Sequence, residues 1–145
     1  MNKKVIQNLI PKAMQAIEEV GIVGKDKKFK KVHEGYINAL GPNIVQSGLL
    51  PTLIFYNKDE RTLWLRALYY MAVGEEKKGI DEFSTDIIRL IIGKEGGSIE
   101  QLKPKAKEWE YKILEYAVAL KLALRTFVVE ESKKDETEQQ KGGER

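Results

Sequence analysis

The sequence predicts an all-α fold, a compact single-domain bundle of about five or six helices. Apolar residues recur every three or four positions in several segments, as they do on the buried face of a helix. No segment of useful length alternates apolar and polar residues as a half-buried strand would. The length of 145 residues, of which 42% are hydrophobic, is enough for one domain with one core.

The first predicted helix covers residues 2–22 and places seven apolar residues on one face. Pro11 lies inside this pattern and either kinks one long helix or opens a shorter one at its first turn. Gly21 and Gly24 end the segment. The apolar face consists of Val5, Ile6, Leu9, Ile10, Ala13, Ile17 and Val20.

Residues 24–31, GKDKKFKK, place five lysines around Phe29, with Asp26 as the only acid. We expect Phe29 to be an anchor in the core, although an aromatic residue among lysines can also stack on a nucleic-acid base. The lysines are either a phosphate-contacting cluster or part of a mobile loop.

Residues 32–58 predict two packed helical segments hinged at Gly48. Residues 57–59 form a turn in which Asp59 is the expected N-cap of a helix over residues 60–73. That helix buries a stripe and turns Arg61 and Arg66 outward. The stripe consists of Leu63, Trp64, Ala67, Leu68 and Met71.

A charged turn over residues 74–79 leads to a predicted helix over residues 81–92 and a glycine-rich loop over residues 93–98. The last helix runs from Pro104 to about Val129. Its inner face consists of Ala106, Trp109, Ile113, Tyr116, Leu120, Ala123, Leu124 and Phe127. Residues 130–145 have no apolar side chain, which predicts a charged, disordered tail behind a domain of residues 1–129.

The charge distribution favours a polyanionic partner. Residues 1–31 hold eight lysines against three acidic residues, a net charge of +5, although the whole chain carries only +3. The alternative is that these lysines only solvate a helical surface.

The sequence offers little for catalysis. His33 is the only histidine and the chain has no cysteine, so no metal site and no cofactor are expected, and His33 itself is expected at the surface or at a helix end. Adjacent glutamates point about 100° apart on a helix and do not converge. No apolar run reaches the roughly 20 residues that span a bilayer. We therefore expect a cytoplasmic protein that is neither an enzyme nor membrane-bound.

Residues 91–102, IIGKEGGSIEQL, are similar to the GxxG loop signature of KH domains, which bind nucleic-acid backbones. Pro104 follows too soon for the KH helix, and Glu95 would place a negative charge in the backbone clamp. A loop between two helices is the preferred interpretation.

Residues 36–58 resemble the small-subunit family of type III-B CRISPR-Cas effector (Cmr) complexes. That family places a tyrosine early in a helix, a proline about six residues later, and a segment of the form (N/S)-G-L-x-x-(T/A)-L-x-F that ends near a lysine. The matching residues are Tyr36, Pro42, Ser47, Gly48, Leu49, Thr52, Leu53, Phe55 and Lys58. Arg125 and Phe127 match the family's closing helix. Pro51 and Thr126 depart from the pattern.

The resemblance implies a non-catalytic RNA-binding scaffold subunit that stacks in several copies along the duplex of guide (crRNA) and target RNA. Its partners would be that RNA, other effector subunits and further copies of itself, in antiviral defence. The resemblance also suggests that Phe55, with Tyr36, Pro42, Gly48 and Leu49, sets the angle between two helices.

The candidate RNA contacts, each of which could equally be an ordinary surface charge, are Lys25, Lys27, Lys28, Lys30, Lys31, Lys58, Arg61, Lys121 and Arg125. Lys121 and Arg125 lie four residues apart with like charge, an arrangement that an anion would stabilise. The alternative function is a protein–protein adaptor that uses Leu114, Val118 and Leu122, apolar residues beside the main stripe of the last helix.

Overall fold

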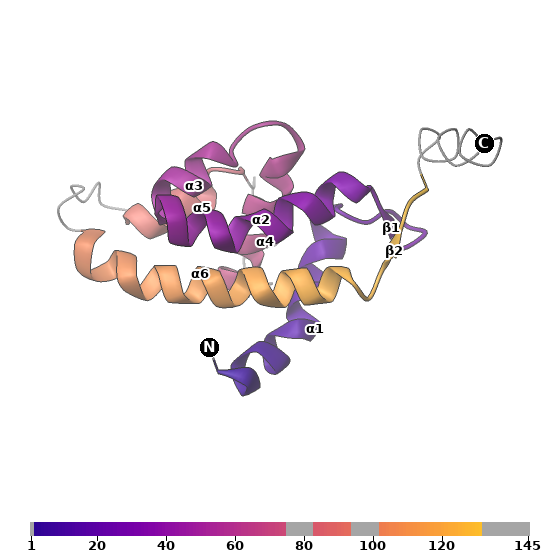
Figure 1. The fold of residues 1–145 in the computed structure, drawn as a ribbon, viewed down its shortest axis with the longest axis horizontal. Helices are drawn as coiled ribbons and strands as arrows, with labels where there is room; N and C mark the ends of the chain where they lie inside the picture. The colour runs from indigo at the N-terminus through magenta and orange to yellow at the C-terminus, as the bar shows by residue number, and fades with distance from the viewer. Residues whose placement is uncertain (1, 75–82, 94–101, 132–145) are drawn as a thin grey trace, which may run out of the picture.

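The computed structural model describes residues 2–74, 83–93 and 102–131, with the backbone alone for 102–106 (Figure 1). These residues form six α-helices, one 3-10 helix and two short strands, which confirms the predicted all-α bundle. In chain order the elements are α1 (Lys3–Glu19), β1 (Lys28–Phe29), α2 (Lys31–Ser47), α3 (Leu49–Phe55), η1 (Asp59–Arg61), α4 (Thr62–Val73), α5 (Asp86–Ile92), α6 (Leu102–Leu124) and β2 (Val128–Val129).

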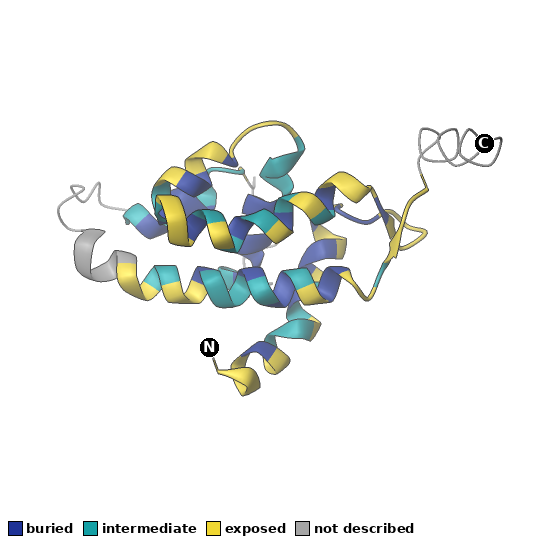
Figure 2. Cartoon of the chain, in the orientation of Figure 1, coloured by how far each residue is buried: buried dark blue, intermediate teal, exposed yellow. Residues whose placement is uncertain are grey.

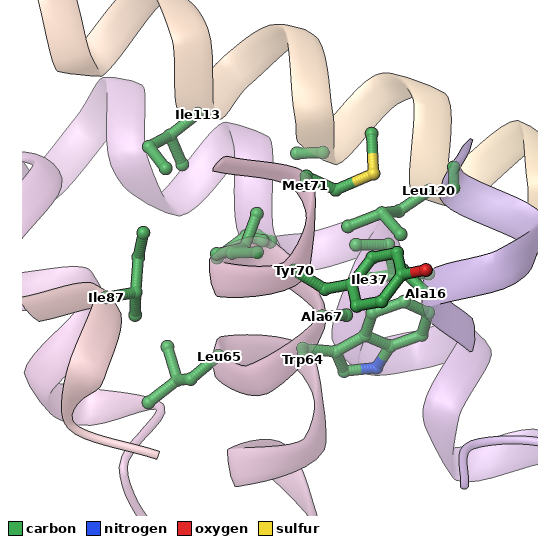
Figure 3. Close-up of a cluster of buried hydrophobic side chains, with 14 of the residues drawn as sticks. Ala16, Ile37, Trp64, Leu65, Ala67, Tyr70, Met71, Ile87, Ile113 and Leu120 are labelled. Carbon is green, nitrogen blue, oxygen red and sulfur yellow. The ribbon is translucent and has the colours of Figure 1, made fainter. Parts of the chain in front are cut away.

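One hydrophobic core joins all the long helices. Trp64 and Leu65 of α4 are fully buried at its centre, where they pack with Ile37 of α2, Ile87 of α5 and Ile113 of α6 (Figure 3). Burying a side chain of this size stabilises a fold by about 1.5–3 kcal/mol. Exposed residues lie mainly on the outer faces of the helices (Figure 2). The prediction that Trp64 and Phe29 belong to the core is confirmed.

α1 is one continuous helix that includes Pro11, so this proline does not start a shorter helix. The Asn2 side chain caps its beginning by accepting a 2.9 Å hydrogen bond from the Lys4 amide. Gly21, at φ 84°, follows its end. Val5, predicted on the buried face, is 37% exposed because the first turn extends beyond the core.

The predicted hinge at Gly48 is confirmed. Gly48 separates α2 from α3 at φ 96° and ψ 157°, a conformation that side-chain-bearing residues rarely adopt. The Thr52 hydroxyl donates to the Asn43 carbonyl at 3.0 Å, and the Tyr56 hydroxyl donates to the Tyr36 carbonyl at 2.7 Å. These two bonds hold α3 folded back against α2.

The predicted end of the last helix is wrong. α6 ends at Leu124, and the Thr126 hydroxyl donates to the Ala123 carbonyl at 2.7 Å in the turn that follows. The β-branched Val128 and Val129 then form β2, which pairs in parallel with β1 in the register Lys28↔Val128. Such a two-residue strand is too short to produce a recognisable sequence pattern.

The predicted helix starts also need correction. Asp59 is not the N-cap of α4, because it lies at φ 53° as the first residue of η1, and α4 begins at Thr62. The helix predicted over residues 81–92 begins at Asp86, and residues 81–82 lie outside the described residues. So do residues 94–98 of the predicted glycine-rich loop and residues 132–145 of the predicted tail. None of the described helices combines the length and apolar character needed to cross a membrane.

Candidate nucleic-acid interface

Most of the predicted basic residues meet at one end of the bundle. β1, β2, the first turn of α2 and the last turn of α6 lie together there (Figure 1). The Val128 amide donates to the Lys27 carbonyl at 3.2 Å, and the Glu130 amide donates to the Phe29 carbonyl at 2.7 Å. The chain around Arg125 is therefore held beside the lysines of residues 25–31. We call this region the basic end.

Residues 58–61 join the basic end through α2. η1 contacts α2, and the Lys30 ammonium lies 3.0 Å from a Glu60 carboxylate oxygen. Lys58 and Arg61, which follow the lysine segment by 27 residues or more in sequence, are thereby brought next to it. Lys121 lies a turn before the end of α6, beside Ile37 and Asn38 of α2. The fold thus brings all three predicted groups of cations to neighbouring elements.

Two of the nine candidates already have acidic partners. Lys27 pairs with Glu18 at 3.0 Å and Lys30 pairs with Glu60 at 3.0 Å, and all four side chains are well exposed. The other seven form no ion pair with a described residue. The hydrogen bond to Glu60 raises the pKa of Lys30, and the same bond lowers the pKa of Glu60. Both groups therefore stay charged at neutral pH.

The predicted pair of Lys121 and Arg125 lies at the C-terminal end of α6. α6 ends at Leu124, so Arg125 belongs to the following turn and is exposed, whereas Lys121 is half-buried on the helix.

Lys25, Lys28 and Lys31 are exposed in and beside β1. Phe29, between them, is 3% exposed and pairs through its backbone with Val23 and Val129. Its burial excludes Phe29 as a stacking surface for a base, and it anchors the lysines to the core instead. The alternation along β1 turns Lys28 outward and Phe29 inward.

His33 is at a helix end, as expected, but it is not at the surface. The side chain is 3% exposed in the first turn of α2, and its Nδ1 atom has no hydrogen-bond partner. Desolvation by burial lowers the pKa of His33, so the ring is neutral at pH 7. No group of three or more metal-ligating side chains occurs among the described residues.

Phe55 is more exposed than the role suggested by the resemblance requires. It is 63% exposed at the end of α3 and is not packed between two helices. The Arg61 guanidinium carbon lies 4.5 Å from the centre of the Phe55 ring, a cation–π distance. The exposed aromatic residue next to a cation is therefore Phe55, and the only sequence signal for this was that Lys58 and Arg61 follow it within six residues.

A groove lies between α2 and α6, and Lys121 is one of the residues that line it. It has a volume of about 440 Å³, and Leu114 and Val118, two residues of the apolar patch predicted for an adaptor, line it. Leu122, the third, is 37% exposed and lies outside the groove. The remaining lining residues are Ile37, Asn38, Gly41, Pro42, Val45, Ala117 and Lys121.

Comparisons of the chain with protein-family models, with curated proteins and with solved structures found no match.

Proposed function

We propose that this protein is a non-catalytic RNA-binding scaffold subunit of a type III-B CRISPR (Cmr) effector complex. In this role several cytoplasmic copies stack along the guide RNA–target duplex, and cleavage belongs to other subunits. The resemblance of residues 36–58 to the small-subunit family motivates the proposal. The all-helical fold and the confirmed hinge at Gly48 are compatible with it.

The observation that carries the proposal is the convergence of cations at the basic end. β1, η1 and the end of α6 are far apart in sequence, yet strand pairing and the contact of η1 with α2 hold them together. A subunit whose sequence choice comes from guide–target pairing needs only such contacts to phosphate. Lys and Arg side chains make these contacts without reading bases.

RNA binding by the purified full-length protein tests the general part of this proposal. We expect weak binding of single-stranded and duplex RNA without sequence preference. The affinity should fall steeply between about 50 and 200 mM salt, and each phosphate contact should add about 0.7–0.9 to the steepness of log affinity plotted against log salt concentration. Replacing Lys28 and Lys31 with Glu should weaken binding at least tenfold and flatten the slope. Replacing Lys3 and Lys4 with Glu, at the exposed start of α1, changes charge equally and is the matched control.

If both double variants lost RNA affinity equally, net charge alone would explain binding, and the result would contradict an interface at the basic end. The specific part of the proposal needs capture of the protein from its native cells. Recovery of repeat-derived guide RNA with repeated backbone subunits supports it, and their absence overturns it.

A second candidate function is a helical protein–protein adaptor, which the groove between α2 and α6 favours. Its lining is mostly apolar, and it contains two residues of the predicted patch. Leu114→Asp and Val118→Asp variants should then lose partner capture that persists after nuclease treatment. Under the RNA-binding proposal, the purified protein binds RNA by itself, which an adaptor without a nucleic-acid role does not.

A further inference from the structure

Exposed aromatic rings are costly to solvate, and Phe55 is unusual in how its exposed ring is held. Phe55 is 63% exposed, although the buried Thr52 lies three residues before it on the same short helix, α3. The buried Tyr56 ring supports it in an edge contact at 6.3 Å between centroids. The ring is therefore fixed at its base while most of its surface faces outward.

Arg61 is held over this ring. Its guanidinium carbon is 4.5 Å from the ring centre, and its Nε atom donates a 3.4 Å hydrogen bond to the Lys58 carbonyl. This bond closes the turn between α3 and α4 and orients the guanidinium group. Planar guanidinium groups and aromatic rings are the two side-chain surfaces on which unpaired RNA bases stack.

We propose that Phe55 and Arg61 form a stacking platform for an unpaired RNA base, an inference that rests on the RNA-binding function proposed above. The ring offers a π face to any base, and Arg61 and Lys58 offer charge to the adjoining phosphates. Phosphate contacts alone bind duplex and single-stranded RNA alike, whereas stacking on a side chain requires a base that is free of its pair. The platform would therefore add a preference for unpaired bases to the proposed RNA binding.

The charges around the platform favour RNA over an apolar protein partner. Glu60, one of the two acids in the turn, is already paired with Lys30 at 3.0 Å. Asp59 is the remaining acid in the turn, and its negative charge would repel an RNA phosphate. Replacing Asp59 with Gly, which its positive φ of 53° accepts, should therefore tighten RNA binding by about threefold.

The test uses a short single-stranded RNA that carries one 2-aminopurine, whose fluorescence is quenched when it stacks, and a fully paired duplex of the same length. Phe55→Leu retains an apolar side chain and removes the π face, whereas Phe55→Trp retains stacking. Tyr111→Leu is the matched control, because Tyr111 is also an exposed aromatic residue, 70% exposed, but lies on another helix, α6. Circular dichroism melts check that each variant is folded.

We expect Phe55→Leu to weaken single-strand binding about tenfold, to abolish the quenching and to leave duplex binding unchanged. Phe55→Trp and Tyr111→Leu should bind as the unmodified protein does. If Phe55→Leu binds and quenches normally while Lys28 and Lys31 remain essential, the platform is refuted and the RNA-binding function stands. If Phe55→Leu loses only nuclease-resistant partner capture, Phe55 is a protein contact and the platform is refuted. An unmodified protein that binds no RNA refutes both proposals.

Discussion

The indole Nε1 of Trp64 donates a 3.1 Å hydrogen bond to the main-chain carbonyl of His33, and the bond is buried. It connects the first turn of α4 to the first turn of α2, thirty-one residues away in sequence. The lysine-rich segment enters α2 immediately before this point. The basic end is therefore attached to the largest fully buried side chain of the core, and its geometry depends on that side chain.

Trp64→Phe should lower the free energy of unfolding by about 1–3 kcal/mol, because it removes the buried hydrogen bond and part of the packed volume. Trp109→Phe on α6 is the matched control: Trp109 is only half-buried, and a loss below about 1 kcal/mol is expected. Urea denaturation at pH 7 measures both. Equal losses would show that the bond to His33 contributes nothing measurable.

Stability should fall as the pH is lowered from 7.5 to 5.5, because of His33. Burial lowers its pKa in the folded state, so the unfolded chain, with an ordinary histidine pKa of about 6.5, takes up the proton first. Stability is thus fully present above about pH 6.5 and declines below it, by at most about 1.4 kcal/mol at pH 5.5. Smaller electrostatic effects also act on the pKa of His33: Glu60 and Glu130 raise it, and Lys30 lowers it.

His33→Gln should remove most of this decline, and urea denaturation at four pH values across the range would detect the change. Glu60 stays ionised throughout, because its pKa is lowered by Lys30. A decline of the same size in His33→Gln would assign the effect to carboxyl groups.

Gly48→Val should destabilise the fold by about 1–3 kcal/mol, because the backbone lies at φ 96°. The cause is backbone strain and not a steric clash, since the nearest atom to an added Cβ would be a Pro51 carbon at 3.6 Å. Gly35→Ala, inside α2 with no atom within 4 Å, should stabilise by about 0.5–1 kcal/mol. RNA binding of folded Gly48→Val should be unchanged; a folded variant that cannot bind would place Gly48 in the site.

Glu60→Gln should tighten RNA binding while changing stability by less than about 1 kcal/mol, because an exposed ion pair contributes little to folding. The substitution frees Lys30 for phosphate and should steepen the log–log salt dependence by about 0.7–0.9. Salt titration of fluorescent RNA measures the slope. Glu108→Gln, on an exposed part of α6 away from the basic end, is the control, and an identical gain there would indicate net charge alone.

The sequence by itself determined which segments are helices and which faces are buried. Local periodicity carries that information, so Trp64, Ile17 and Leu120 were correctly predicted in the core. The hinge at Gly48 could also be predicted, because a glycine between two apolar helical patterns marks a change of backbone direction. The nine candidate cations were recognisable as a basic set, but nothing local indicated that three separate segments converge.

Only the tertiary structure decided what each face meets. Phe29 lies among five lysines in the sequence and Phe55 follows an apolar segment, yet it is Phe29 that pairing with Val23 and Val129 buries, whereas Phe55 is exposed at the end of α3. The ion pair between Lys30 and Glu60 joins residues thirty positions apart, and β2 exists because β1 lies beside it. Periodicity specifies an apolar face, but burial, ion pairing and strand formation depend on the partner that long-range packing brings to it.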